Sequence, residues 1–440
     1  YTFNNGLFGG YNPATKLYDK STWQFEMDEQ GKVRRDPTLR HPRCVLQLLK
    51  KHYSRYTPAK VSEITGVRQD TLLKVYKAFS ETGKPDKSGT ILYALGWTQH
   101  TVGVQNIRTS GIIQLLLGNV GIAGGGINAL RGEPNVQGTT DHAILYNVLP
   151  GYLPVPRANM PTLAEYNKMT TPVSKEPNSI NWWQNRPKYM VSLLKAYFGD
   201  YAHKENDFGY SWLPKADIVK NEHDGDYSYI YLFDKMFNGE LKGGSIWATN
   251  PAQSLPNSNK VRKALSNLDF LYISEIHANE TTDFWRGPGM NPKEVKTEVF
   301  LFPSCHRAEK EGSISNSGRW ILWHNKAVNP MGDSKPMGQI MIDIMNKVKK
   351  LYEKEGGVFS EPINKLNWYK KYEPEVVAKR INGTFVSGDN KGKLLTGFLD
   401  FSDDGSTASL NWLYAGTITD KDGNRLKRRS LEQTPLQAAI

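Results

Sequence analysis

The sequence lacks the residues and patterns that mark several large classes of protein. Its 440 residues include two cysteines, Cys44 and Cys305, which lie far apart, so the chain alone cannot supply a zinc or iron–sulfur site. It has no apolar run near the ~18 residues that a membrane-spanning helix needs. Its first residues also lack the charged-then-apolar pattern of a signal peptide.

Common catalytic signatures are absent as well. The chain has no phosphate-loop lysine motif, GxGxxG fingerprint, serine elbow or HExxH motif. His100, His142, His277 and His306 show no spacing typical of a metal site, so we interpret each as structural. The length predicts two or three domains.

The chain is basic, with a net charge of +12 and a pI near 9.3. Such an excess raises a nucleic acid or an anionic membrane as a partner. The basic residues are spread along the chain and interleaved with acids, which favours a solvated basic surface, and an anionic cofactor could account for part of the excess.

The most informative stretch is Gly118–Asp141. It holds the triplet Gly124–Gly126, then Arg131 and several amide side chains. We expect these glycines to take positive φ and to allow close approach of a ligand. A single guanidinium beside them suits a small carboxylate or phosphate. The alternative is a flexible surface loop that contains an arginine.

The order of elements predicts an α/β fold. A helix is expected over 45–52, a helix pair broken at Gly66 over 61–79, a buried strand over 90–96 and a helix over 104–117. Five residues of the helix pair are expected to face inward: Leu72, Leu73, Val75, Tyr76 and Phe79.

A second α/β segment follows a long aromatic and proline-rich insert. We interpret residues 142–240 as an extended covering loop with helices near 188–197 and 229–237. Beyond it, strands are expected over 244–247, 270–276 and 297–303, and a helix over 260–268.

Two tips of this second segment carry possible binding chemistry. Glu275 lies near a strand end, with Thr281 and Thr282 just after, an arrangement that can hydrogen-bond a sugar or base. The polar loop 309–319 suits a pyrophosphate. The alternatives are a solvated strand end and a helix cap, which also favours Ser and Asn.

Five segments in order carry a resemblance to a known family. They are GWTQH (96–100), LLLGNVGIAGGGINALRGEPNVQG (115–138), WATNP (247–251), ISEIHANETTDF (273–284) and EKEGSISNSGRW (309–320). This set resembles the large, catalytic subunit of respiratory formate dehydrogenases, which are molybdopterin oxidoreductases. The resemblance runs along essentially the whole chain.

The resemblance implies a cofactor and roles for individual residues. The cofactor is a bis-molybdopterin guanine dinucleotide with molybdenum or tungsten, and the reaction is oxidation of formate to CO2 or its reverse. Arg131 matches the arginine that orients formate. Three residues match positions that line the pterin: Gln99, Gly132 and Gln137. Five match positions around a guanine dinucleotide: Asn250, Pro251, Glu275, Thr281 and Ser315.

The resemblance also implies what lies outside this chain. The family's four-cysteine segment for a [4Fe-4S] cluster, its selenocysteine or cysteine metal ligand and its C-terminal domain are not matched here, so we expect an internal portion that is inactive alone. No metal ligand is expected in this chain. The expected domains are 1–131, 132–345 with the insert 142–240, and 346–440 as an extension.

The expected partners are formate or CO2, the remaining segments of the subunit, an iron–sulfur subunit and a cytochrome subunit, with no nucleic acid and no membrane span. The family location is the periplasm. Three alternatives remain: another molybdopterin oxidoreductase, a scaffold that holds dinucleotide without turnover, and a basic nucleic-acid-binding protein.

Overall fold

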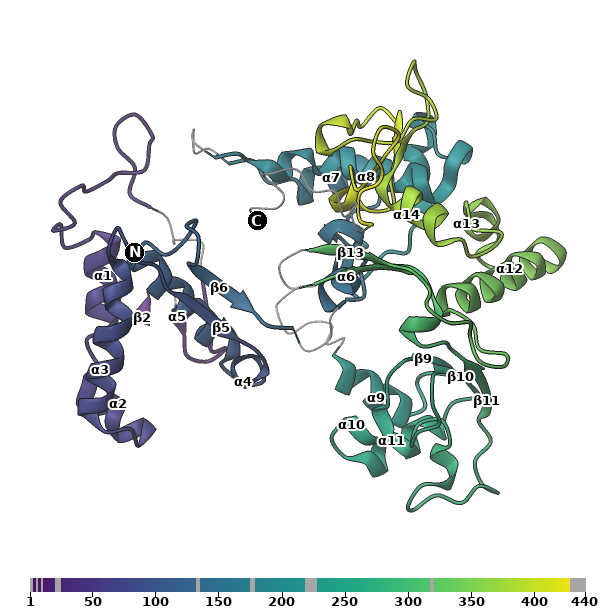
Figure 1. Ribbon diagram of the computed structural model, residues 1–440, viewed down its shortest axis with the longest axis horizontal. Coiled ribbons are helices and arrows are strands. Elements are labelled where there is room, and N and C mark those ends of the chain that lie inside the picture. The colour runs from purple at the N-terminus through teal and green to yellow at the C-terminus, as the bar shows by residue number, and fades with distance from the viewer. Residues whose placement is uncertain are drawn as a thin grey trace. The chain divides into compact units, whose positions relative to one another are not determined.

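The computed structural model describes residues 3–4, 7–8, 11–19, 25–131, 135–174, 179–217, 228–316 and 320–427 (Figure 1). The chain forms two compact units. The N-terminal unit comprises residues 1–130 and 174–179, and the C-terminal unit comprises 131–173 and 180–440. Of the helices in the described ranges, none combines the length and apolar character that crossing a membrane requires.

The N-terminal unit is built from helices around a short parallel strand pair. Two small antiparallel pairs open it, β1 (Phe3–Asn4) with β2 (Leu7–Phe8) and β3 (Tyr11–Asn12) with β4 (Leu17–Tyr18). The helices are α1 (Val45–Tyr53), α2 (Pro58–Thr65), α3 (Gln69–Ser80), α4 (Leu95–Thr98) and α5 (Gly103–Leu116). Strand β5 (Thr90–Tyr93) pairs in parallel with β6 (Gly126–Ala129).

The predicted break at Gly66 is confirmed. Thr57 caps the start of α2 by accepting the Lys60 N–H, and Gly66 ends the helix in the left-handed conformation that glycine favours. The predicted inward face of α3 is wrong for Leu73, Val75 and Tyr76, which are exposed. Strand β5 is shorter than predicted and is half-buried rather than buried. Within the described part of this unit, nothing covers these side chains.

The glycine triplet forms a tight turn whose need for glycine differs at each position. Gly124 and Gly126 have positive φ, of 74° and 90°, as predicted. Gly125 does not, so its predicted positive φ is wrong. A Cβ on Gly125 would instead lie 2.1 Å from the carbonyl oxygen of Asn119. Asn119 is fully buried and accepts the Gly89 N–H at 3.2 Å, so it cannot move aside easily.

The C-terminal unit contains an open parallel sheet in the order β11-β10-β9. Its strands are β9 (Gly243–Trp247), β10 (Phe270–Glu275) and β11 (Glu298–Pro303), all close to the predicted ranges. Helices α9 (Tyr229–Phe237), α10 (Pro251–Ser254) and α11 (Ser258–Leu265) lie beside the sheet (Figure 1). Apolar residues of α9, α11 and β10 form one core, which confirms the α/β fold class.

A second, larger core corrects the interpretation of the insert. The two helices predicted within residues 142–240 are confirmed as α8 (Arg186–Phe198) and α9. The segment as a whole is not an extended covering loop, because α7 (Leu163–Thr170) and α8 bury their apolar side chains. Leu395, Phe401 and Trp412, from the predicted extension, complete this core. Tyr189 of α8 stacks on Trp412 with ring centroids 4.3 Å apart, and the Trp412 indole donates to the Gly151 carbonyl at 2.8 Å.

The remaining elements of this unit are short, apart from one long helix. They are β7 (Val148–Leu149), β8 (Leu153–Pro154), α6 (Val136–Asp141), β12 (Gly312–Ser315), β13 (Ile321–His324), α12 (Met337–Glu355), α13 (Ser360–Lys365), α14 (Pro374–Asn382), β14 (Thr384–Phe385), β15 (Thr407–Ala408), β16 (Ile418–Thr419) and β17 (Gly423–Asn424).

The turn makes a specific prediction about stability. Replacing Gly125 by Ala should destabilise the N-terminal unit by about 1–3 kcal/mol, because the new Cβ forces a backbone shift. The matched control is Gly96→Ala, where the Cβ meets nothing within 4 Å. Urea unfolding of both variants measures the difference, and an equal stability would contradict the close packing at Gly125.

Candidate functional site

The carboxyl ends of the parallel strands bring several predicted residues together. In an open α/β sheet this edge is where ligands bind. The chain leaving β9 stays attached to the next strand, because the Ala248 N–H donates to the Ser274 carbonyl at 2.9 Å. In the same way, the Ser304 N–H donates to the Glu275 carbonyl at 2.9 Å. The segments after all three strands are therefore held at one edge.

Asn250 and Thr281 form a closed hydrogen-bonded pair at this edge. The Thr281 hydroxyl donates to Asn250 Oδ1 at 2.7 Å and accepts the Ala252 N–H at 3.0 Å. Thr281 is fully buried, and Pro251, which begins α10, is also buried. Asn250 is half-buried and donates to Glu280 at 2.6 Å, a bond that lowers the pKa of that carboxyl. Thr281 and Pro251 thus position Asn250.

Glu275 ends the central strand β10 and keeps one oxygen available. Its Oε1 accepts the N–H of the following residue, Ile276, at 2.8 Å, and its side chain is half-buried. Nearby, the hydroxyls of Ser274 and Ser304 are buried without a hydrogen-bond partner. Unpaired buried hydroxyls cost stability and are unusual in a native fold. The strand ends therefore place a carboxylate and an amide at the edge where open α/β sheets bind their ligands.

A second group of predicted residues lies around α6. Gln137 is half-buried on this helix, and Asn135, just before it, accepts the Ser315 N–H at 2.9 Å. A Cβ on Gly138 would lie 3.2 Å from that of Ser315, so glycine lets α6 pack closely on β12. Ser315 itself is buried, and its hydroxyl lies 2.7 Å from the Tyr414 hydroxyl. Ser315 therefore serves to join segments.

Asp141, at the end of α6, is the centre of this buried network. Its carboxylate accepts from the Tyr152 hydroxyl at 2.8 Å and from the Tyr414 hydroxyl at 3.0 Å. Because the Tyr414 proton points to Asp141, Ser315 is the donor to Tyr414. The Asp141 carbonyl accepts from Asn411 at 2.8 Å. Asp141 is buried, so these charge-assisted bonds act in a low-dielectric interior.

His142 extends the network and is held neutral. Its ring stacks on Tyr414 with centroids 4.8 Å apart, and its Nδ1 lies 3.1 Å from the Asn411 amide nitrogen, which can only donate. Burial lowers the pKa of His142, and the nearby Asp141 opposes this shift to a smaller extent. The network thus links α6 to residues about 270 positions later in the chain.

The other predicted residues lie elsewhere. Gln99 is exposed in the N-terminal unit, just after α4, which follows β5. Arg131 is exposed and follows the carboxyl end of β6 by two residues. Gly132 and the loop residues 317–319 lie outside the described residues. Sequence reasoning gave no role to Asp141 or Tyr414, and no local pattern connects the two.

Comparison with known proteins places the chain in a family. Residues 54–285, more than half of the chain, match the molybdopterin oxidoreductase family. The chain belongs to this family. Membership implies a molybdopterin cofactor with molybdenum or tungsten.

The molybdopterin oxidoreductase is similar to three curated proteins over nearly its whole length. It is 57% identical to formate dehydrogenase 2 subunit alpha (cytochrome c-553) of Nitratidesulfovibrio vulgaris, over 100% of this chain and 44% of that protein. It is 50% identical to formate dehydrogenase subunit alpha of Megalodesulfovibrio gigas, over 100% of this chain and 44% of that protein. It is 44% identical to the nitrate-inducible formate dehydrogenase major subunit of Escherichia coli, over 98% of this chain and 43% of that protein. The chain thus spans less than half the length of these relatives.

The residues at the strand ends fit a molybdopterin oxidoreductase. Glu275 has an oxygen that can accept a hydrogen bond from a base or a ribose hydroxyl, and Asn250 is held with its amide at the same edge. Within the described ranges, no three His, Cys, Asp or Glu side chains are grouped so as to hold a metal ion.

Removing the Tyr414 hydroxyl tests the network. Tyr414→Phe deletes a bond to buried Asp141 and one to Ser315, so stability should fall by about 1–3 kcal/mol and amide exchange of α6 should rise. Tyr231→Phe, on the partly exposed α9, is the matched control. Unchanged exchange of α6 in Tyr414→Phe would show that the network does not fix this helix.

The buried histidine predicts a pH dependence. The folded-state pKa of His142 is lowered, so below about pH 6.5 the unfolded state takes up a proton that the folded state does not. Stability should therefore be complete above this pH and fall as the pH drops below it. His142→Asn should reduce this loss, whereas His277→Asn, at an exposed position, should not. Urea unfolding between pH 5 and pH 8 measures it, and identical slopes in all three proteins would refute it.

Proposed function

We propose that this chain is a portion of a formate dehydrogenase catalytic subunit, which oxidises formate to CO2 or carries out the reverse reaction. One observation carries the proposal. Five formate dehydrogenase alpha or major subunits are 42–57% identical to it over at least 98% of its length. F420-dependent formate dehydrogenases are 27–28% identical over 70% of the chain.

The cofactor proposed is a bis-molybdopterin guanine dinucleotide with molybdenum or tungsten. Glu275 and Asn250 would contact a guanine dinucleotide, because their side chains are only half-buried at the strand ends. Pro251, Thr281 and Ser315 are buried, so they would hold these segments in place. Gln99, Gly132 and Gln137 are proposed to line the pterin.

Arg131 is proposed to bind the substrate. Its planar guanidinium can donate two parallel hydrogen bonds to the formate carboxylate, which fixes the direction of the C–H bond. When bound, the metal–pterin group would supply the acceptor for the two electrons that formate loses. Exclusion of water around the carboxylate would strengthen both hydrogen bonds. The residues of this chain would therefore orient the substrate and stabilise its charge.

The electrons would leave through a [4Fe-4S] cluster held by residues outside this chain, and then through an iron–sulfur subunit and a cytochrome subunit. We place the assembled enzyme in the periplasm, as in the respiratory enzymes that the sequence resembles. Exposed apolar residues on α5, such as Val104, Leu115 and Leu116, support association with further segments.

The role of Arg131 has a direct test. In the assembled enzyme, Arg131→Lys should keep metal and pterin but lower kcat/KM for formate roughly tenfold to a hundredfold, because an ammonium cannot reproduce a two-pronged bond worth about 1.5–3 kcal/mol. Arg108→Lys, at an exposed position on α5, is the control. Formate-dependent dye reduction provides the rates, and a variant as active as the wild type would exclude the assigned role.

A further inference from the structure

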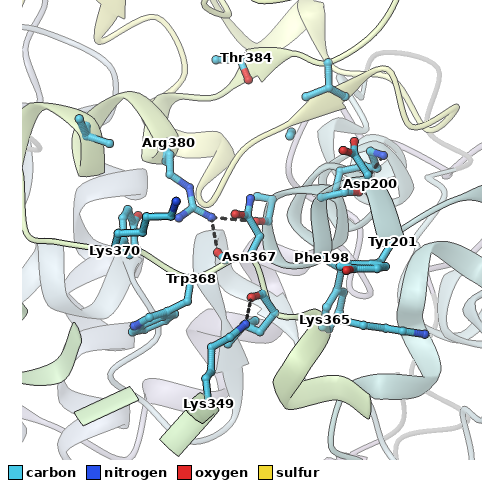
Figure 2. A pocket seen from close by; sticks show the side chains of 18 of the residues that line it. Phe198, Asp200, Tyr201, Lys349, Lys365, Asn367, Trp368, Lys370, Arg380 and Thr384 are labelled. Atoms are coloured by element: carbon cyan, nitrogen blue, oxygen red, sulfur yellow. Dashed lines mark hydrogen bonds between the residues drawn. The ribbon is translucent and has the colours of Figure 1, made fainter. Parts of the chain in front are cut away.

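A basic hollow lies in the C-terminal unit, away from the strand ends. It has a volume of about 1170 Å³ and is lined by the end of α8, by α12–α14 and by the irregular segment 366–371 between α13 and α14. Figure 2 shows Arg380, Lys349 and Lys365 projecting from three different helices around it. All of these elements belong to the same compact unit. None of the residues assigned above to the pterin or the dinucleotide lines this hollow.

The lining is strongly positive. It contains six cations and two carboxylates. The cations are Lys195, Lys349, Lys365, Lys370, Lys371 and Arg380. Lys371 pairs with Glu373 at 2.8 Å, and Lys365 pairs with Glu361. Concave surfaces lined by one sign of charge concentrate the field and attract ions of the other sign.

Three of these cations are bound to backbone carbonyls instead of carboxylates. Lys195 donates to the carbonyls of Gly199 and Ala202, at 3.0 and 2.8 Å. In the described ranges, none of the three cations (Lys195, Lys349 and Arg380) forms an ion pair with another residue. Partial burial lowers the pKa of Lys195, and the carboxylate of Asp200 opposes this shift to a smaller extent.

Lys349 and Arg380 repeat this arrangement. Lys349 donates to the carbonyls of Asn364 and Leu366, at 3.0 and 2.6 Å. Arg380 uses Nη2 to reach the carbonyls of Ala196 and Asn367, at 3.0 and 2.8 Å, and its guanidinium lies 4.2 Å from the centre of the Tyr369 ring. Each cation is therefore fixed in place by two acceptors.

Fixing these side chains leaves donors to spare. An ammonium has three N–H groups and a guanidinium has five, so each lysine retains one donor and Arg380 retains those on Nε and Nη1. The entropy cost of ordering the long side chains is already met in the folded chain, which favours binding.

The simplest alternative is that these cations only satisfy carbonyls at helix ends. That reading explains the contacts but not the excess of positive charge, since a neutral amide would satisfy a carbonyl without the cost of burying a charge. Three buried polar atoms of the lining, Asn364 Oδ1, Trp368 Nε1 and Tyr369 OH, also lack a hydrogen-bond partner. The segment 364–369 is thus not optimised for stability alone.

We propose that the basic hollow binds a small ligand with a chain of phosphate groups, either a nucleoside triphosphate or an inorganic polyphosphate. Phosphate oxygens accept several hydrogen bonds each, which suits scattered single donors on fixed cations. The lining has four more cations than carboxylates, and Glu361 neutralises one of these cations, Lys365, so about three positive charges remain for a ligand with three or four negative charges. A single phosphate would fill only a small part of the volume. The site is independent of the formate reaction.

The test is calorimetric titration of the purified protein, together with any segments and subunits with which it assembles. The probes are tripolyphosphate, ATP and a glutamate-rich peptide, each at 50 and 200 mM salt. We expect the two phosphate probes to bind at least tenfold more tightly than the peptide, with binding weakened by salt, and to slow amide exchange in 364–371.

Equal affinities for ATP and tripolyphosphate indicate recognition of the phosphate chain, and tighter binding of ATP indicates recognition of its base as well. Peptide binding as tight as that of phosphate, or exchange unchanged at 364–371, overturns the proposal.

Two variants locate the binding. Lys370→Gln, at an exposed position on the rim, should weaken tripolyphosphate binding at least threefold, and Lys349→Gln with Lys370→Gln at least tenfold. Glutamine keeps an N–H donor for one of the two carbonyls that Lys349 binds. Circular dichroism checks that the variants are folded. Lys391→Gln makes the same change outside the hollow and should leave the affinity unchanged. Equal weakening by Lys370→Gln and Lys391→Gln would indicate non-specific attraction and contradict the site.

Discussion

The buried carboxylate of Asp141 is the constraint on which the arrangement of the C-terminal unit depends. Two tyrosine hydroxyls donate to it, and one of them, from Tyr414, also joins Ser315. Since Asn135 at the other end of the same helix accepts from Ser315, α6 is held at both ends. Helix α6, which begins at Val136, is thereby attached to the buried core of this unit. In the proposed enzyme, such support would matter for the role proposed for Arg131, because small displacements of an orienting group have large effects on rate.

The same logic applies at the strand ends, where buried residues hold the more exposed ones. Thr281 has no exposed surface, yet it fixes Asn250 through a bond of 2.7 Å. The chain therefore uses hydroxyls and amides in its interior to position the carboxylate and amide at the edge of the sheet. In the proposed formate dehydrogenase, these residues contribute orientation, while the chemistry belongs to the cofactor.

Much of the fold was predictable from the sequence because its signals are local. The strands β9, β10 and β11 are short apolar runs bounded by polar turns, and the left-handed Gly66 marks the end of α2. The network at Asp141 was not predictable, because Tyr414 and Asn411 are about 270 residues away in the chain. The helices α8 and α9 of the insert were predicted, but its buried packing was missed, because its core is completed by the distant Trp412. Arg131 was singled out by its surroundings, but its function remains a proposal.

The central claim is that this chain belongs to an enzyme that oxidises formate, and one measurement addresses it directly. The assembled enzyme, purified with its metal content determined, is assayed for formate-dependent reduction of a redox dye per metal atom. The account predicts turnover with formate at a rate that scales with the content of molybdenum or tungsten. A preparation fully loaded with metal and pterin that reduces no dye with formate, and forms no formate from CO2 with a reduced dye, would contradict it.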